Sequence, residues 1–94
     1  MAQPIHQVCV VGSGTMGTQI ALQCAVFGKS VWLHDTREEA LQRSPTTMSA
    51  ILDEMTEAGL VSDEDRSKVF DRIQQTTSAS EAASDADLVI EAVK

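Results

Sequence analysis

The sequence predicts an α/β fold in which parallel strands alternate with helices. Two short apolar runs, at residues 8–11 and 31–33, are typical of buried strands. The loop after the first run, residues 12–17, reads G-x-G-x-x-G, and the stretch that follows carries apolar residues at helical spacing. Because parallel strands are joined by crossover connections that usually contain a helix, this order indicates a βαβ unit at the start of a parallel sheet.

The first strand is expected at about residues 7–11 and the first helix at about 15–27. The predicted apolar face of this helix consists of Met16, Ile20, Ala21, Cys24 and Phe27. Gly28 then ends the helix, because glycine readily takes the left-handed conformation that follows many helix ends. The second strand is expected at 30–34, where it completes the βαβ unit.

A pair of helices is expected next, at about residues 36–74. Its first part, 36–58, carries an apolar stripe but also Pro45. Proline inside a helix removes a hydrogen bond and clashes with the preceding turn, at a cost of ~3 kcal/mol. We therefore expect either a kinked helix or two helices that meet near this proline. The second part, up to about residue 73, is expected to begin with Ser62 as N-cap, because the acidic residues that follow favour a helix N-terminus.

Three shorter elements complete the predicted fold. They are a third strand at about 75–77, a small helix that Ser80 caps and that ends at Ala83, and a last strand at 88–93. In a doubly wound sheet the four strands take the order 3-2-1-4, and ligands bind outside their carboxyl ends, where strands 1 and 4 diverge. The glycine-rich loop and Ala92-Val93 should therefore face each other across one cleft.

Each glycine of the loop has a physical role in binding a dinucleotide. Gly12 allows the tight turn out of the first strand, Gly14 lets a pyrophosphate approach the backbone, and Gly17 lets the helix pack closely on the strands. The backbone N–H groups of Thr15, Met16 and Gly17 point to the bound anion, and the helix dipole adds partial positive charge there. Strand, loop, helix and second strand thus form the fingerprint of a Rossmann-type dinucleotide-binding half-fold.

Asp35 follows the second strand, eighteen positions after Gly17, and completes this fingerprint. Its carboxylate can accept hydrogen bonds from the ribose hydroxyls of adenosine and would repel the 2′-phosphate of NADP, so we predict NAD as the cofactor. Arg37 leaves two interpretations open, a solvated residue in the first helical turn or a basic group that reaches a 2′-phosphate. The predicted cofactor-binding residues are Gly12, Gly14, Thr15, Met16, Gly17, Asp35, Thr36, Arg37, Ala92 and Val93.

Composition limits the partners of the chain. Its 94 residues suffice for one small domain, and its formal net charge of −7 argues against nucleic acid or an anionic membrane as a partner. The negative charge does not prevent phosphate binding, because backbone amides at a helix N-terminus need no lysine. No apolar run is long enough to span a membrane and no secretory signal is visible, so we expect a cytoplasmic protein.

Cysteine and histidine indicate no metal site and no catalytic site. Cys9 and Cys24 fall in the predicted strand and on the apolar helix face, without ligand spacing, and are expected to be small core residues. His6 and His34 are isolated in the sequence. His34 either lines an adenosine pocket beside Asp35 or lies at an edge or surface of the fold. We therefore assign no metal ligand and no catalytic residue.

The whole pattern resembles the NAD-binding domain of 3-hydroxyacyl-CoA dehydrogenases. The resemblance covers residues 5–93 and rests on the glycine-rich loop, the strand end Leu33-His34-Asp35, the inserted helical pair and the closing run at 86–93. It implies hydride transfer between a 3-hydroxyacyl thioester and NAD, with a catalytic histidine–glutamate pair downstream of the matched segment. It also implies that residues 1–94 are an incomplete Rossmann domain, inactive alone, from a two-domain enzyme that forms a homodimer.

The charge of the helical pair leaves the substrate carrier open. Residues 37–72 contain five basic and nine acidic residues, a net charge of −4, which would oppose a triphosphorylated CoA head. A hydroxyacid that is free or linked to an acyl carrier protein is therefore an alternative to a CoA-linked substrate.

Two alternatives come from other classes of protein. A stand-alone dinucleotide-binding module without catalysis would expose the last strand as an apolar sheet edge, which favours pairing with another chain. A flavoprotein also uses a glycine-rich loop of this kind, but such folds usually prefer glutamate to aspartate after the second strand.

Overall fold

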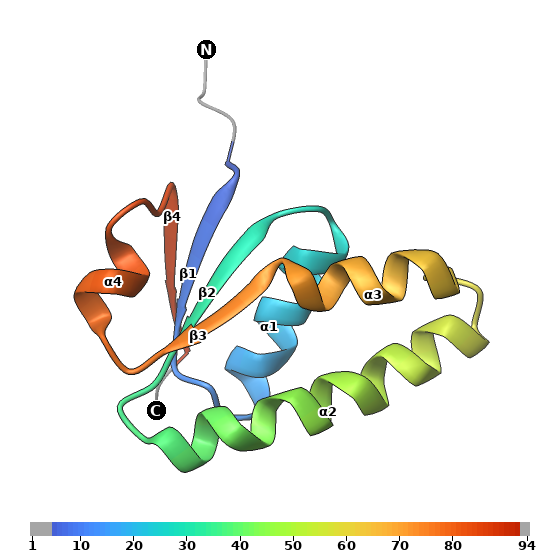
Figure 1. The fold of residues 1–94 in the computed structure, drawn as a ribbon, viewed down its shortest axis with the longest axis horizontal. Coiled ribbons are helices and arrows are strands. Elements are labelled where there is room, and N and C mark those ends of the chain that lie inside the picture. Colours follow the sequence, from blue (N-terminus) through green and yellow to red (C-terminus); the bar gives the residue numbers. More distant parts are fainter. Residues whose placement is uncertain (1–4, 93–94) are drawn as a thin grey trace.

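A computed structural model describes residues 5–92 of the chain, and within them four parallel strands form one sheet (Figure 1). The strands are β1 (Gln7–Val11), β2 (Ser30–His34), β3 (Ile73–Thr76) and β4 (Leu88–Glu91). The helices are α1 (Thr15–Val26), α2 (Glu38–Glu57), α3 (Asp63–Asp71) and α4 (Ala79–Ala83). The strand order across the sheet is β3-β2-β1-β4, which confirms the predicted order.

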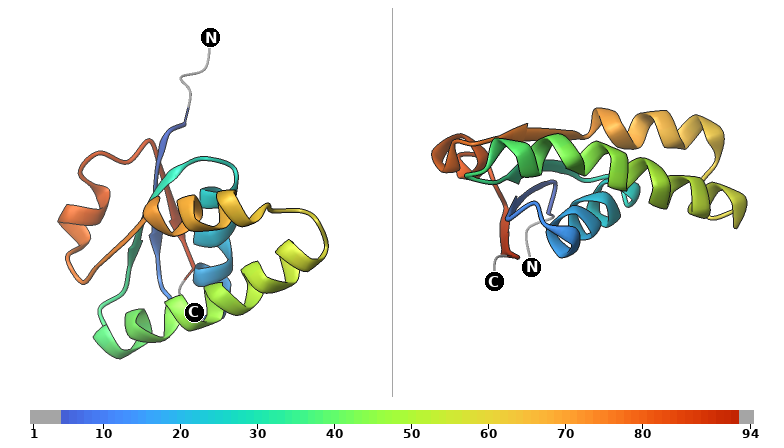
Figure 2. Two further views of the ribbon diagram at one scale, coloured as in Figure 1. Left: turned by 45° about the vertical axis from the view of Figure 1, so that its right-hand side comes forward. Right: turned by 90° about the horizontal axis from the view of Figure 1, so that it is seen from below.

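Helices lie on both sides of the strands. α1 packs on β1 and β2 and contacts α2 and α3, whereas α4 packs on β1, β2 and β3 from the opposite side, as Figures 1 and 2 show. The buried core residues are Val8, Val10, Ala21, Leu22, Ala25, Val31, Leu33, Leu41, Met48, Leu52 and Val69. We call residues 38–71 the helical arm, because Figure 2 shows α2 and α3 extending together away from the strands.

The buried face of α1 agrees with the predicted one only in part, because Ala21 is buried and Ile20 and Cys24 pack against the core, but Met16 and Phe27 do not. Met16 and Phe27 are 66% and 72% exposed, and the residues that are buried are Gly17, Thr18, Ala21, Leu22 and Ala25. The reason is the close approach of Gly17 to the turn after β1, which turns this side of the helix to the sheet. Gly28 does follow α1 with a φ of 89°, which confirms the predicted helix end.

α2 passes through Pro45 as one helix, so the expectation of two helices that meet there is wrong. Proline has no N–H, so the carbonyl of Leu41, four residues earlier, loses its helical donor. The side chain of Gln75 in β3 replaces that donor, since its Nε2 donates to the Leu41 carbonyl oxygen at 2.9 Å. A residue from the sheet therefore satisfies the backbone of the helix at its proline.

Several predicted boundaries shift by one to four residues. Ser62 caps α3 as predicted, accepting from the N–H of Asp65 at 3.1 Å, but the helix ends at Asp71 because Ile73 already pairs with Val31 in the sheet. The cap of α4 is Ser78, whose hydroxyl accepts from the N–H of Glu81, so the assignment of Ser80 was wrong. The last strand, β4, ends at Glu91, and its predicted end at Val93 lies outside the described residues.

β4 forms one edge of the sheet, and Leu88 and Val89 on it are 40% and 50% exposed. Asp87 fixes the start of this strand against β1, because its Oδ2 accepts from the N–H groups of His6 and Gln7 at 2.9 and 3.0 Å. Those two hydrogen bonds lower the pKa of Asp87 below its ordinary value.

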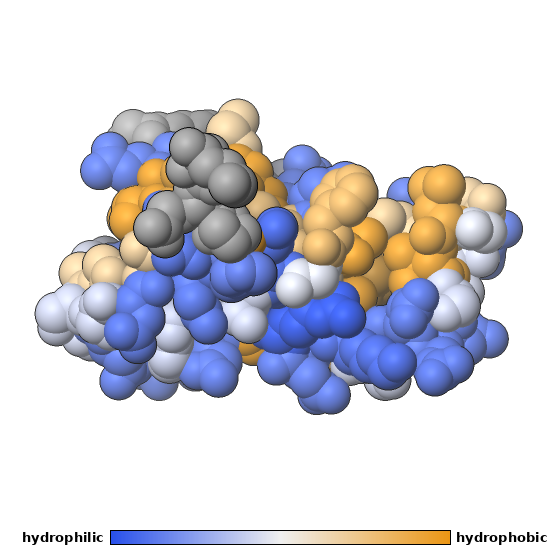
Figure 3. Space-filling view, turned by 90° about the horizontal axis from the view of Figure 1, so that it is seen from above, coloured by the Kyte–Doolittle hydropathy of each residue, from blue (hydrophilic) through white to orange (hydrophobic). Residues whose placement is uncertain are grey.

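A second exposed apolar region lies at the far end of the helical arm. Figure 3 shows it at the right, where the chain passes from α2 to α3. Leu60 in this connection is 72% exposed. On the same arm Arg66 of α3 pairs with Asp53 of α2, which ties the two helices together.

Candidate functional site

A cleft with a volume of about 900 Å³ lies at the carboxyl ends of β1, β2 and β4. Its lining residues are Gly12, Gly14, Thr15, Met16, Gln19, Asp35, Thr36, Arg37, Glu91 and Ala92. The structure thus brings together eight of the residues that the sequence singled out. Gly17 lies beneath the cleft, and Val93 falls outside the described residues.

Two lining residues, Gln19 and Glu91, were not predicted. Gln19 lies one helical turn after Thr15 on α1, so helical spacing could have placed it beside the loop. Glu91 is the last residue of β4, and its register opposite Val11 brings it to the cleft. The sequence placed Glu91 inside the last strand but did not give the register that brings it to the cleft.

The glycine-rich turn has the geometry that its sequence indicates. Gly12 has a φ of 103°, which strongly favours glycine, and its N–H donates to the carbonyl oxygen of His34 at 2.7 Å. A Cβ on Gly17 would lie 1.7 Å from the Gly12 carbonyl oxygen, so this position excludes any side chain. A Cβ on Gly14 would meet nothing within 4 Å, because this residue faces open space.

The N-terminus of α1 is available to an anion. Gly14 is its N-cap and provides no side-chain hydrogen bond, and the first turn contains no acidic residue. Within residues 5–92 the structure gives no acceptor for the backbone N–H groups of Thr15 and Met16. Free N–H groups and the positive end of the helix dipole point at the space in front of Gly14, which fits a pyrophosphate.

Asp35 lies deep in the cleft wall and is 6% exposed. Its Oδ2 accepts from the N–H and the hydroxyl of Ser13 at 2.8 and 2.9 Å, and its Oδ1 accepts from the N–H of Arg37 at 2.9 Å. Burial alone would raise the pKa of this carboxyl, but the hydrogen bonds from Arg37 and Ser13 outweigh it. They hold the pKa of Asp35 well below its usual range.

Arg37 is exposed, as expected for a solvated residue, but its guanidinium is also hydrogen-bonded to Asp35. Its side chain is 58% exposed, yet its Nε lies 3.3 Å from Oδ1 of Asp35 and its Nη2 lies 3.4 Å from Oδ2. The neighbouring carboxylate raises the pKa of Arg37 through these hydrogen bonds. The guanidinium is therefore exposed on the cleft lining while it remains hydrogen-bonded to the carboxylate.

His34 does not line the cleft, and it does not lie at an exposed edge either, so both predicted positions are wrong. It is 6% exposed, because β2 is an interior strand between β1 and β3. Its Nε2 lies 3.2 Å from the carbonyl oxygen of Thr77, while its buried Nδ1 has no partner among the described residues.

Cys9 is buried and Cys24 is half-buried, which confirms their prediction as core residues, and burial raises the pKa of both thiols. Within residues 5–92 no group of three potential metal ligands comes together. None of the helices in that range combines the length and the apolar character needed to cross a membrane.

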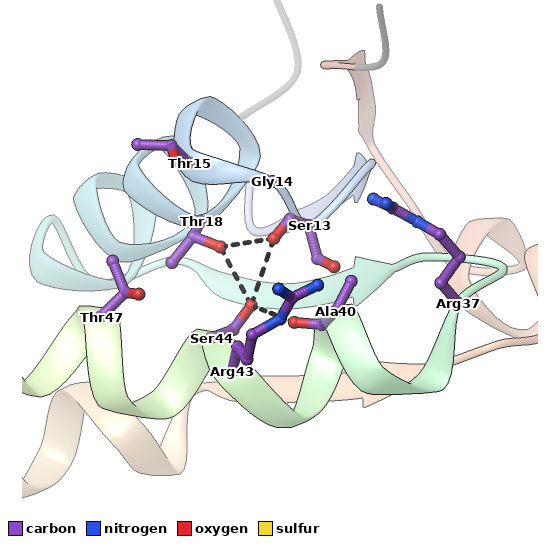
Figure 4. Close-up of a pocket in the computed structure, with 9 residues that line it drawn as sticks. All are labelled: Ser13, Gly14, Thr15, Thr18, Arg37, Ala40, Arg43, Ser44 and Thr47. Atoms are coloured by element: carbon purple, nitrogen blue, oxygen red, sulfur yellow. Dashed lines mark hydrogen bonds between the residues drawn. The ribbon is translucent and has the colours of Figure 1, made fainter.

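A second, smaller pocket lies between the glycine-rich turn and α2 and has a volume of about 250 Å³ (Figure 4). Buried hydroxyls form its floor. The Oγ1 of Thr18 donates to the carbonyl oxygen of Ser13 at 2.9 Å and lies 3.0 Å from the Oγ of Ser44, whose hydroxyl also reaches the carbonyl oxygen of Ala40. This network joins the turn to α2, and no motif in the sequence indicated it.

These observations define the class of the protein. A parallel sheet in the order 3-2-1-4, a glycine-rich turn before an uncapped helix and a buried acid after β2 make up a Rossmann-type dinucleotide-binding domain. Within this class, the family described as 3-hydroxyacyl-CoA dehydrogenase, NAD binding domain, matches residues 7–94. The chain belongs to this family, and NAD is the cofactor that the family's domain binds. The predicted family, fold class and cofactor are thereby confirmed.

Known proteins similar to the chain agree with this assignment. It is 34% identical to the fatty acid oxidation complex subunit alpha of Pseudomonas putida over 93 residues, covering 99% of this chain and 13% of that protein. It is 35% identical to a probable 3-hydroxyacyl-CoA dehydrogenase of Caenorhabditis elegans, covering 96% of this chain and 32% of that protein. The crystal structure of (S)-3-hydroxybutyryl-CoA dehydrogenase from Ralstonia eutropha matches with a TM-score of 0.88 at 34% identity, covering 97% and 32% of the two chains. The chain thus spans a third or less of the length of these relatives.

Proposed function

We propose that this chain is the NAD-binding part of an oxidoreductase that oxidises a 3-hydroxyacyl thioester to the 3-oxo form. One observation carries the proposal. In this chain of the family, the uncapped N-terminus of α1 and Asp35 line the same cleft. Relatives named for 3-hydroxyacyl-CoA and 3-hydroxybutyryl-CoA dehydrogenation support a CoA thioester as the substrate.

In this proposal the chain holds the cofactor at two places. The backbone N–H groups of Thr15 and Met16 donate to the pyrophosphate, and the open space at Gly14 admits it to the backbone. Asp35 accepts from the ribose hydroxyls of the adenosine half, and Ala92 borders the cleft on the opposite side. When bound, NAD supplies the hydride acceptor.

Arg37 and Ser13 compete with the ribose for Asp35. Both oxygens of the carboxylate already accept hydrogen bonds from these two residues. The exposed side chain of Arg37 is the easier one to displace, because the Ser13 bonds are buried. The ribose hydroxyls therefore take the positions that the guanidinium holds.

The proposal also covers the substrate carrier, the quaternary structure and the location in the cell. The family resemblance puts the catalytic histidine–glutamate pair downstream of the matched segment, and we assign none of residues 5–92 to catalysis. We propose a homodimeric, cytoplasmic enzyme. The net charge of −4 on residues 37–72 keeps a hydroxyacid that is free or bound to a carrier protein as a second candidate.

The test uses the full-length protein with the same 3-hydroxyacyl group presented as CoA thioester, carrier-protein thioester and free acid. We expect NAD reduction, followed by its absorbance, with the CoA thioester. Activity restricted to another form would assign the substrate to that form, and NAD binding without reduction in all three would support a binding module instead.

The variant Gly14→Val tests the cofactor site separately. Its side chain would fill the space that the pyrophosphate needs, so NAD binding should be lost while the unfolding transition stays cooperative. Ala50→Val, at an exposed position of α2, is the matched control and should bind NAD normally. Normal NAD binding by Gly14→Val would contradict the site.

A further inference from the structure

We propose that Glu91, at the end of β4, makes the cleft favour the oxidised cofactor, by raising its affinity for NAD relative to its affinity for NADH. The inference rests on the proposed function, because this carboxylate can act only on a dinucleotide that lies in the cleft. It concerns the part of the cleft that lies on the other side of β1 from Asp35.

Glu91 and Asp35 flank the turn that follows β1. In the sheet register, Val11 of β1 lies opposite His34 of β2 on one side and opposite Glu91 of β4 on the other. β1 therefore runs between β4 and β2 (Figure 1). Because neighbouring strands are about 4.8 Å apart, the ends of β2 and β4 are separated by roughly 10 Å.

The two halves of a dinucleotide then lie on different sides of this turn. NAD has one ribose on each side of its pyrophosphate, and dinucleotides bind across the crevice where the strand order reverses, here between β1 and β4. In the proposed site Asp35 accepts from the adenosine ribose, and the N–H groups of Thr15 and Met16 donate to the pyrophosphate. The nicotinamide half is therefore expected at the end of β4, where Glu91 and Ala92 line the cleft.

The charges that line the cleft are distributed unevenly between its two ends. The charged lining residues are Asp35, Arg37 and Glu91, and the first two form an ion pair. Among residues 5–92 no basic group lies within 4.0 Å of the Glu91 carboxylate. Two negative groups and one positive group give this lining a net charge of −1, and the ion pair leaves that charge at the β4 end.

The packing of β4 does not require a carboxylate at this position. Side chains alternate between the two faces of a strand, and Ile90 and Ala92 pack against the core, whereas Glu91 is exposed. An exposed strand position accepts other polar side chains without loss of buried contacts. The negative charge of Glu91 is therefore available to act on a ligand in the cleft.

A negative charge at this end distinguishes the two forms of the cofactor. The nicotinamide ring of NAD is cationic, and it becomes neutral in NADH when it accepts a hydride, which is a proton with two electrons. The phosphates carry the same charge in both forms, so the N-terminus of α1 favours neither. The Glu91 carboxylate attracts the cationic ring and gains no such attraction from the neutral ring.

This difference bears on the direction of the proposed reaction. Oxidation of a hydroxyl substrate begins with bound NAD and ends with bound NADH. By lowering the relative affinity for the reduced product, Glu91 eases its release and so favours oxidation.

Isothermal titration of the full-length protein with NAD and with NADH, without acyl substrate, tests the proposal through the ratio Kd(NADH)/Kd(NAD). Glu91→Gln keeps the size of the side chain and removes its charge, so the ratio should fall by about fivefold, mainly because NAD binds more weakly. Glu91→Asp, which keeps the charge, should retain most of the ratio. Asp85→Asn removes an exposed carboxylate that does not line the cleft and should leave the ratio unchanged.

The other outcomes overturn the inference in distinguishable ways. An unchanged ratio in Glu91→Gln, whether both affinities fall together or neither changes, would overturn it and leave the proposed function intact. An equal fall of the ratio in Asp85→Asn would assign the effect to the overall charge of the chain, and an equal fall in Glu91→Asp would assign it to side-chain length. Failure of the wild type to bind either dinucleotide would overturn the proposed function and this inference with it.

Discussion

Residues 7–35 and the helical arm, residues 38–71, are held in shape by different kinds of contact. In the first region the turn before α1 is fixed by residues close in the sequence, through the close approach of Gly17 to the Gly12 carbonyl. In the arm the backbone of α2 at Pro45 depends on a distant residue, because Gln75 of β3 donates to the Leu41 carbonyl, 34 positions away. A steric limit therefore fixes the turn locally, whereas this part of α2 depends on the finished sheet.

The largest effect should come from breaking the local contact with Gly17→Ala. The new Cβ would lie 1.7 Å from a backbone oxygen, and a backbone atom cannot move aside without displacing β1. We expect a loss of about 3 kcal/mol or more in the free energy of unfolding, at the upper end of overpacking effects, measured by denaturant titration.

Gly14→Ala is the control for this prediction. Its Cβ meets nothing within 4 Å and its φ is −66°, so we expect its stability to change by less than about 1 kcal/mol. Equal destabilisation by the two variants would show that the close approach of Gly17 does not determine the packing of α1.

Asp35→Asn, in the same region, should have the next largest effect on the free energy of unfolding. The amide would place a donor against the donors of Ser13 and Arg37, so we expect a loss of about 2 kcal/mol at pH 7. Because the folded-state pKa of Asp35 is depressed, its stabilisation is complete above the unfolded pKa of about 4 and is lost as the pH falls through the folded pKa.

Free energies of unfolding measured from pH 7 down to pH 3 check this prediction. The difference between the wild type and Asp35→Asn should shrink as the pH falls below about 4. Asp85→Asn, at an exposed acid, serves as the control for loss of a carboxylate. A difference that grew toward acid pH would have the wrong sign and would contradict the assignment.

Gln75→Ala tests the distant contact of the arm. It leaves the Leu41 carbonyl without a donor opposite Pro45, and we expect a loss of about 1 kcal/mol. Pro45→Ala restores the helical N–H, so in that background the same Gln75→Ala change should cost almost nothing. A double-mutant cycle measures this coupling, and additive effects would show that Gln75 does not replace the missing donor.

Local signals account for what the sequence could predict. The turn at Gly12 and the acid at Asp35 follow from spacing that one βαβ unit contains, and the strand order follows from the doubly wound sheet that this unit predicts. Met16 and Phe27 were wrongly predicted to lie on the buried face of α1, because both obey helical periodicity while the close approach of Gly17 decides the rotation of the helix. The network of Thr18 and Ser44 was missed because it joins hydroxyls from two helices, which no local pattern relates.

Changes to the cap of α4 should have the smallest effect on stability. They test whether local sequence signals can place the start of a helix at a single residue. Ser78 and Ser80 both precede an alanine-rich stretch, so residue preference alone does not distinguish them. In the structure the Ser78 hydroxyl accepts from the Glu81 N–H at 3.2 Å, whereas the Ser80 hydroxyl lies near that of Ser78. Ser78→Ala should cost about 0.5–1 kcal/mol and Ser80→Ala less, by thermal or denaturant unfolding. The reverse order would move the start of α4 to the position that the sequence first indicated, and would bring its N-terminus two residues closer to β4.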